Sequence, residues 1–142
     1  MLIKDLTKIF LYTTIVAKGK VSMNLAVDRV DKQSLIRENY NKIYKHELAH
    51  KMAGGQYAGA IHIEKNAQGI PISGHVSIQM PTLDKKNPQK TIDHANTVIR
   101  AAMAPSDPSG QDYKVAASAR NIKMQALAVK NNNQGKKLDR QA

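Results

Sequence analysis

The stretch that decides the fold is YKHELAHK, residues 44–51, which contains the pattern H-E-x-x-H. On a helix, His46 and His50 lie four residues apart on one face, so both imidazoles can reach a single metal ion. Glu47 projects beside them and can accept a proton from a water molecule at the metal. The sequence therefore predicts a helix that carries a catalytic zinc site, with Glu47 as the general base.

The motif lies in a segment, residues 32–53, that is predicted to be one helix. This segment contains no proline, and Gly54 and Gly55 follow it as a stop signal. At about 100° per residue, Glu47 falls within an apolar stripe that the two histidines flank. A carboxylate on an apolar face is costly without a partner, and a neighbouring cation would be such a partner. The stripe consists of Ile36, Tyr40, Ile43 and Tyr44.

A catalytic zinc site needs a third protein ligand, and the spacing of residues leaves its identity open. The extended metzincin pattern would place Gly three residues and His six residues after His50. Those positions hold Ala53 and Gln56, so that subclass is excluded. The remaining histidines, any of which could complete the site, are His62, His75 and His94.

The residues after the motif predict an α+β arrangement. Two strand-like runs, 57–64 and 70–80, flank the turn-forming residues 66–69 and are expected to form a hairpin. Residues 91–104 and 112–129 show apolar stripes with helical spacing. We therefore expect a zincin-like fold, in which the active-site helix is followed by a β-hairpin and two C-terminal helices.

The two ends of the chain are predicted to differ from this domain. Residues 1–30 contain a run rich in β-branched and aromatic side chains and a turn signal at Lys18-Gly19-Lys20, so we expect strands there. Residues 131–142 form a basic, polar tail that is expected to be disordered. Residues 31–130 remain as the metalloprotease domain.

The composition excludes several classes of function. The 142 residues include 22 Lys and Arg, 11 Asp and Glu, and no Cys, which gives a net charge of +11. Without Cys the chain can form no disulfide, thiolate zinc site or iron–sulfur cluster. Because it has only one Phe, five Tyr and no Trp, and no nucleic-acid motif, we expect no specific nucleic-acid binding.

The longest strongly apolar run covers residues 9–17. It is too short to span a bilayer, so no transmembrane segment is expected. Residues 1–17 could act as a signal peptide, although no A-x-A cleavage pattern follows them. We therefore favour a cytoplasmic location and keep secretion as the alternative.

Three segments carry a resemblance to a known family: HELAHKMAGGQYA (46–58), GHVSI (74–78) and RAAMAPSDPSGQD (100–112). Together they resemble the SprA-related family of bacterial zinc metalloproteases, over about residues 35–130. The family has Glu where this chain has His75, and both residue types are competent zinc ligands. The resemblance therefore favours His75 over His94 as the third ligand. Asp93 or Glu64 could then accept a hydrogen bond from a ligand imidazole.

The expected function is that of a zinc-dependent metallopeptidase acting on a peptide or protein substrate. His46, His50 and His75 would hold the zinc ion, water would fill the fourth position, and Glu47 would transfer the proton. A group that stabilises the oxyanion is also expected. The candidates for it are Tyr57, His94 and Arg100.

Two alternatives belong to other classes of function. In the first, zinc only holds the helix to the hairpin, and the protein is a non-catalytic interaction module. In the second, the H-E-x-x-H pattern is accidental, with His46 and His50 on the surface and Glu47 in a salt bridge. The protein would then be a basic one that binds nucleic acid or an anionic surface.

Overall fold

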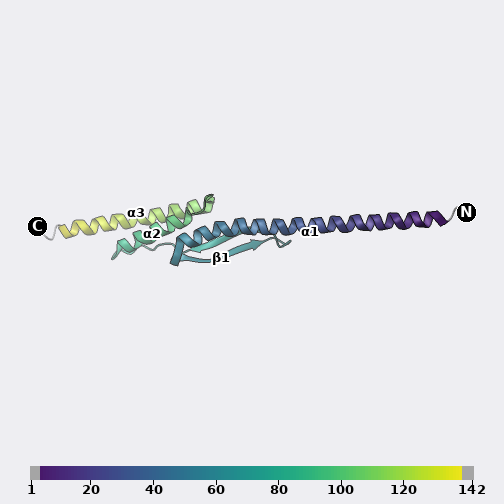
Figure 1. Ribbon diagram of the computed structural model, residues 1–142. Coiled ribbons are helices and arrows are strands. Elements are labelled where there is room, and N and C mark those ends of the chain that lie inside the picture. Colours follow the sequence, from purple (N-terminus) through teal and green to yellow (C-terminus); the bar gives the residue numbers. More distant parts are fainter. Residues whose placement is uncertain (1–3, 139–142) are drawn as a thin grey trace. The chain divides into compact units, whose positions relative to one another are not determined.

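A computed structural model gives the order of elements as α1 (Lys4–Gly54), a short 3-10 turn (Gly55–Tyr57), β1 (Ala58–Lys65), β2 (Pro71–Ile78), α2 (Pro88–Ala102) and α3 (Gly110–Leu138) (Figure 1). The structure describes the backbone of residues 4–138 and the side chains of residues 29–134. The predicted α+β class is confirmed: over residues 4–138, three helices accompany one two-stranded antiparallel sheet. The chain divides into two units, residues 1–39 and 40–142, and the H-E-x-x-H motif lies in the second.

Helix α1 confirms the prediction over residues 32–53 and corrects it over residues 4–30, where strands were expected. Strand propensity depends strongly on context, so a β-branched run alone does not define a strand. The first proline of the chain is Pro71, so nothing in the preceding sequence breaks a helix sterically. A nucleated helix gains a hydrogen bond with each added residue, and a residue such as Gly19 costs it only about 1 kcal/mol.

The β1–β2 hairpin forms where the sequence predicts it. Its turn is closed by the Asn66 side chain, whose Oδ1 accepts hydrogen bonds from the backbone N–H of Gln68 (3.0 Å) and Ile70 (2.9 Å). Gly69 has a φ of +78°, a conformation that glycine adopts at little cost. The register pairs Ile61 with Val76, His62 with His75, Ile63 with Gly74 and Glu64 with Ser73. His62 and His75 are therefore direct cross-strand neighbours.

Strand β2 lies very close to α1 at Gly74. A Cβ atom added there would lie 2.6 Å from Cγ2 of Ile43 and 2.9 Å from Cγ of Glu47. Only a residue without a side chain fits this approach. Because Glu47 belongs to the H-E-x-x-H motif, the hairpin packs directly on the part of α1 that carries the candidate chemistry.

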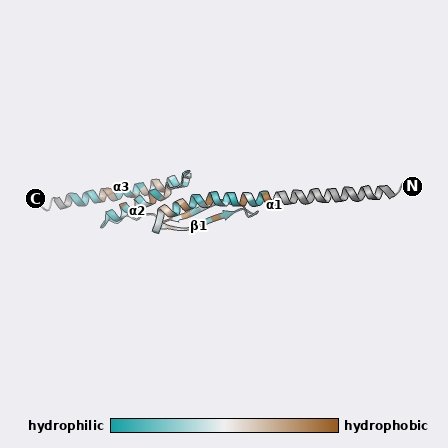
Figure 2. Ribbon diagram, in the orientation of Figure 1, coloured by the Kyte–Doolittle hydropathy of each residue, from teal (hydrophilic) through white to brown (hydrophobic). Residues whose placement is uncertain are grey.

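The core lies between α2 and α3, whose predicted apolar stripes are confirmed as buried faces. The buried residues of these faces are mostly alanine, which allows two helix backbones to approach closely, around the larger side chain of Val98. Figure 2 shows hydrophilic and hydrophobic residues alternating along these helices, as expected when one face is buried. The buried apolar residues are Ile92, Ala95, Val98, Ala101, Ala102, Ala116, Ala119 and Ala126.

The connection before α2 is fixed by side-chain to backbone hydrogen bonds. Asn87 caps the helix by accepting a hydrogen bond from the backbone N–H of Lys90, and Pro88 occupies the first turn. Oδ1 of Asp84 accepts hydrogen bonds from the backbone N–H of Asn87 and of Lys86, both at 2.9 Å. These bonds favour the charged carboxylate and lower the pKa of Asp84 below its ordinary value of 3.8.

Helix α3 continues through residues 131–138, so the disordered tail predicted there is wrong for these residues. No proline occurs after Pro108, and α3 therefore extends without a steric stop. The last residues of the predicted tail, 139–142, lie outside the described part of the chain. In the part that the structure describes, no helix has both the length and the apolar character needed to cross a membrane.

The close approach at Gly74 leads to a prediction about stability. Gly74→Ala should lower the free energy of unfolding by about 1–3 kcal/mol, because the new methyl group overlaps Ile43 and Glu47. Gly59→Ala is the matched control in the same hairpin, since its Cβ would lie an ordinary 3.5 Å from Ser77. Urea unfolding of both variants measures the difference. Equal free energies of unfolding of Gly74→Ala and Gly59→Ala would show that β2 does not approach α1 as closely at Gly74 as described.

Candidate functional site

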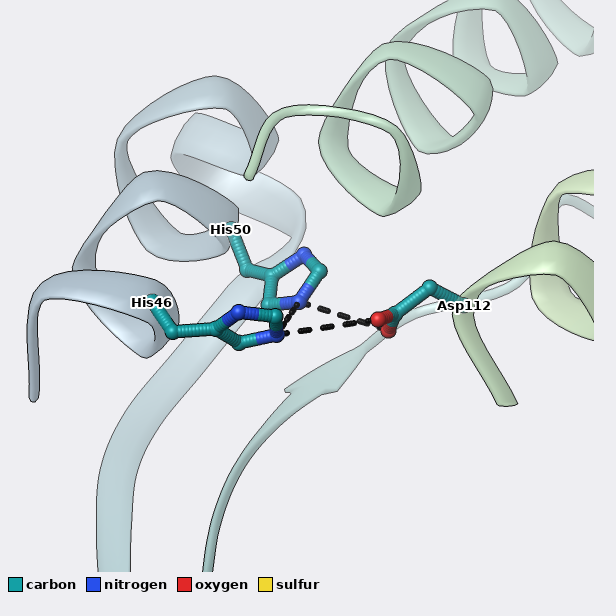
Figure 3. Close-up of side chains that lie close together, drawn as sticks. All are labelled: His46, His50 and Asp112. Atoms are coloured by element: carbon teal, nitrogen blue, oxygen red, sulfur yellow. Dashed lines mark hydrogen bonds and ion pairs between the residues drawn. The ribbon is translucent and has the colours of Figure 1, made fainter. Parts of the chain in front are cut away.

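Three side chains from two helices converge at the candidate site (Figure 3). His46 and His50 project from α1 and point toward Asp112 in the first turn of α3. Nε2 of His50 lies 3.2 Å from Nε2 of His46 and 3.3 Å from Oδ1 of Asp112. Nε2 of His46 lies 3.7 Å from Oδ2 of Asp112. Among the described residues, this is the group of His and carboxylate side chains that could hold a metal ion.

The other ring nitrogen of each histidine is held by an oxygen atom. Nδ1 of His50 lies 2.8 Å from the backbone carbonyl oxygen of Ala101, and Nδ1 of His46 lies 3.3 Å from Oδ1 of Asp107. Carbonyl and carboxylate oxygens can only accept hydrogen bonds, so both imidazoles must donate through Nδ1–H. A neutral imidazole that carries its proton on Nδ1 leaves Nε2 with a free lone pair.

The site therefore brings acceptors together without a donor between them. The two Nε2 lone pairs and the Asp112 carboxylate face one another within 3.2–3.7 Å. Such an arrangement is repulsive unless a proton or a metal cation lies between the groups. Neutral imidazole and carboxylate are also the ligand types that divalent metal ions take from proteins. The donor set thus fits a cation.

Asp112 is oriented by the start of its own helix. Ser109 precedes α3, and its backbone N–H donates to Oδ2 of Asp112 at 2.6 Å. In return, the backbone N–H of Asp112 donates to Oγ of Ser109 at 3.2 Å. This reciprocal pair is a capping box, with Asp112 at the third helical position. It holds Oδ2 and leaves Oδ1 directed toward His50.

Glu47 is buried beneath the hairpin, where the described part of the chain offers it no polar partner. Its residue surface is only 6 % exposed, and its Cγ lies against Gly74. Among the described residues it forms no hydrogen bond or ion pair, and its oxygens retain contact with solvent. A carboxylate with so little access to water, on the same turn of helix as two converging histidines, is unusual unless it acts on something bound there.

The structure places the predicted third ligand, His75, in different surroundings. His75 and His62 are exposed on one face of the hairpin, where their rings stack with centroids 5.1 Å apart. The group around His46 and His50 includes Asp112 and does not include His75. His94 is also engaged elsewhere, because its ring stacks on Tyr57 at 3.6 Å and its Nε2 donates to the carbonyl oxygen of Gln79.

The other residues singled out from the sequence have local partners. Arg100 is exposed and donates to Oγ1 of Thr97. Glu64 accepts a hydrogen bond from Ser73, and Asp93 accepts one from Gln89. The site histidines instead donate hydrogen bonds to the Asp107 carboxylate and to the carbonyl oxygen of Ala101. The expected role of Asp93 and Glu64 as their acceptors therefore does not match these contacts.

Reasoning from the sequence missed Asp112, although a signal for it was present. Ser109-Gly110-Gln111-Asp112 has the spacing of a capping box and directly precedes an apolar helical stripe. It also ends the distinctive segment 100–112. That segment served only to support the family resemblance, whereas it supplies the carboxylate and both acceptor contacts of the site.

Comparison with known proteins gives one finding. The model of the SprA-related family matches residues 21–139, which is most of the chain and includes every residue of the candidate site. Comparison with curated proteins and with solved structures gives no match.

Proposed function

The chain belongs to the SprA-related family, and we propose that it is a zinc-dependent peptidase. In this proposal His46, His50 and Asp112 hold the metal and Glu47 is the general base. The observation that carries the proposal is the convergence of two Nε2 lone pairs and a carboxylate, with both Nδ1 atoms already used as donors. Asp112 takes the place that the sequence alone gave to His75.

The distances between the ligand atoms support zinc. Around a tetrahedral zinc ion with bonds of about 2.0–2.2 Å, two ligand atoms lie about 3.3–3.6 Å apart. Nε2 of His50 lies 3.2 Å from Nε2 of His46 and 3.3 Å from Oδ1 of Asp112, while Nε2 of His46 lies 3.7 Å from the other carboxylate oxygen, Oδ2. Small movements of the side chains would bring both nitrogens and one carboxylate oxygen to bonding distance. Both imidazoles also have the Nδ1 hydrogen bonds that orient histidine ligands in zinc proteins.

Three features favour a catalytic site over a structural one. The group supplies three protein ligands, whereas structural zinc sites have four. The side chains of His46 and Asp112 are 22 % and 17 % exposed, so a substrate can approach from solvent. Glu47 directly follows His46 on α1, and its carboxylate has no hydrogen-bond or ion-pair partner among the described residues.

Glu47 is suited to move a proton between water and a leaving group. Bound zinc would supply an activated water molecule and polarise the carbonyl to be attacked. The Glu47 carboxylate would accept a proton from that water and donate it to the amine that leaves. Its packing against Gly74 restricts the side chain to one region, so the carboxylate is positioned in advance.

The hairpin supports a peptide as the substrate. The sheet contains only β1 and β2 among the described residues, so each strand has one edge without a strand partner. Extended peptides bind such edges through main-chain hydrogen bonds. Because β2 packs on α1 at Glu47, a peptide paired with the hairpin would run close to the proposed base.

The ligand assignment predicts metal contents. After equilibration with zinc and desalting, the wild-type protein should retain about one zinc ion per chain, measured by elemental mass spectrometry. His46→Ala and Asp112→Asn should lose most of it, because each removes one of three ligands. His75→Ala is the matched control and should retain it. Loss in His75→Ala with retention in Asp112→Asn would instead identify His75 as the third ligand.

The catalytic assignment predicts that Glu47→Gln binds zinc as the wild type does but hydrolyses peptides at least about 100-fold more slowly. The amide keeps the shape of the side chain and cannot accept the proton. Cleavage of a fluorescence-quenched peptide library measures the rate, and Glu38→Gln, at an exposed position of the same helix, is the control. A zinc-loaded wild type without any turnover would favour the non-catalytic module.

A further inference from the structure

The groups that orient the three proposed ligands come from one short segment. The ligands belong to α1 and α3, but their hydrogen-bonding partners are Ala101, Asp107 and Ser109. These three lie at the end of α2 and in the connection to α3. A single stretch of nine residues, 101–109, therefore forms a hydrogen bond with each of the three proposed ligands.

This connecting segment, residues 101–109, is built to keep one conformation. Ala101 is fully buried in the helix core, so its carbonyl oxygen is a fixed point for His50. Pro105 and Pro108 restrict two φ angles on either side of Asp107, and Pro105 is buried. The segment ends at Ser109, which caps α3. Its two ends are thus anchored in the two helices that form the core.

The side chain of Asp107 is held near His46 without being buried. Its side chain is 73 % exposed, yet Oδ1 lies 3.3 Å from Nδ1 of His46. A carboxylate that accepts from Nδ1–H fixes the ring orientation and makes Nε2 a better electron donor. Ser109 orients Asp112 in another way: its backbone N–H donates to Oδ2 of Asp112, which leaves Oδ1 directed toward His50.

We propose that the connecting segment sets the metal affinity of the site, and that Asp107 and Ser109 are positioning residues for His46 and Asp112. The inference rests on the proposed function, since it concerns the same metal site. It goes further by assigning the orientation of two of the three proposed ligands to residues of the connecting segment that are not themselves proposed ligands. The third, His50, is oriented by the rigid end of α2.

The test is the zinc dissociation constant of full-length variants, measured by competition with a chromogenic chelator. Asp107→Ala should weaken zinc binding about tenfold, the lower end of the usual effect of such partners. Ser109→Ala should weaken it less, because it removes the Oγ acceptor of the Asp112 backbone N–H but keeps the backbone N–H that holds Oδ2 of Asp112. Ser109→Thr should restore wild-type affinity, because it keeps the hydroxyl group of the capping box. Ser106→Ala is the matched control, since Ser106 is exposed in the same loop and has no partner among the described residues.

Two further readouts separate positioning from general stability. The thermal midpoint of metal-free Asp107→Ala should equal that of the wild type, because its side chain is mostly exposed. In the zinc-loaded protein, the Nδ1–H resonance of His46 should be lost to solvent exchange in Asp107→Ala, while that of His50 persists. This selectivity would not arise from a global loss of structure.

The outcomes are distinct for the two proposals. A wild-type protein that binds no zinc would overturn the proposed function, and this inference with it. Tight wild-type binding with Asp107→Ala within twofold of it would overturn the inference alone. Ser106→Ala could also weaken zinc binding as much as Asp107→Ala does. That result would overturn the inference too, because any change in the loop would then lower the affinity, whether or not it removes a contact with a ligand.

Discussion

The site depends on a shortage of hydrogen-bond donors. His46 and His50 both use Nδ1–H to bind oxygen atoms, so their Nε2 lone pairs and the Asp112 carboxylate meet with nothing between them. Each contact that holds the site together therefore increases the mutual repulsion at its centre. A cation turns this repulsion into attraction, and for this reason the arrangement is more informative than the H-E-x-x-H pattern alone.

The groups that surround the site are fixed by packing elsewhere in the fold. Close packing of alanines fixes α2 against α3, which places the Ala101 carbonyl and the start of α3. Beside α1, the absence of a side chain at Gly74 lets β2 lie against Glu47. One helix turn thus directs its histidines toward Asp112 of α3 while its glutamate packs against the hairpin. Because Glu47 directly follows His46, the proposed base stays beside the proposed ligands.

The sequence predicted the parts of this arrangement that depend on local patterns. The helix over 32–53, the hairpin with its Asn66 turn and the stripes of α2 and α3 follow from periodicity and turn chemistry, and the structure contains them. Asp112 could not be found in this way, because it meets His50 only through tertiary packing. His75 looked suitable by type, but the strict alternation of a strand places it beside His62 on the exposed face. Over residues 4–30, local composition favoured strands and helix propagation prevailed.

In the capping box, the Asp112 carboxylate both caps the start of α3 and faces the histidines of the site. A ligand carboxylate must be held in one orientation, and holding it costs conformational entropy. At the third position of α3, Asp112 is already ordered by the exchange of hydrogen bonds with Ser109, which the helix needs to satisfy its first N–H groups. Only one carboxylate oxygen is used for this exchange. The other oxygen, Oδ1, is left free of this exchange. It points toward His50 because the capping box at the start of α3 fixes the orientation of the carboxylate.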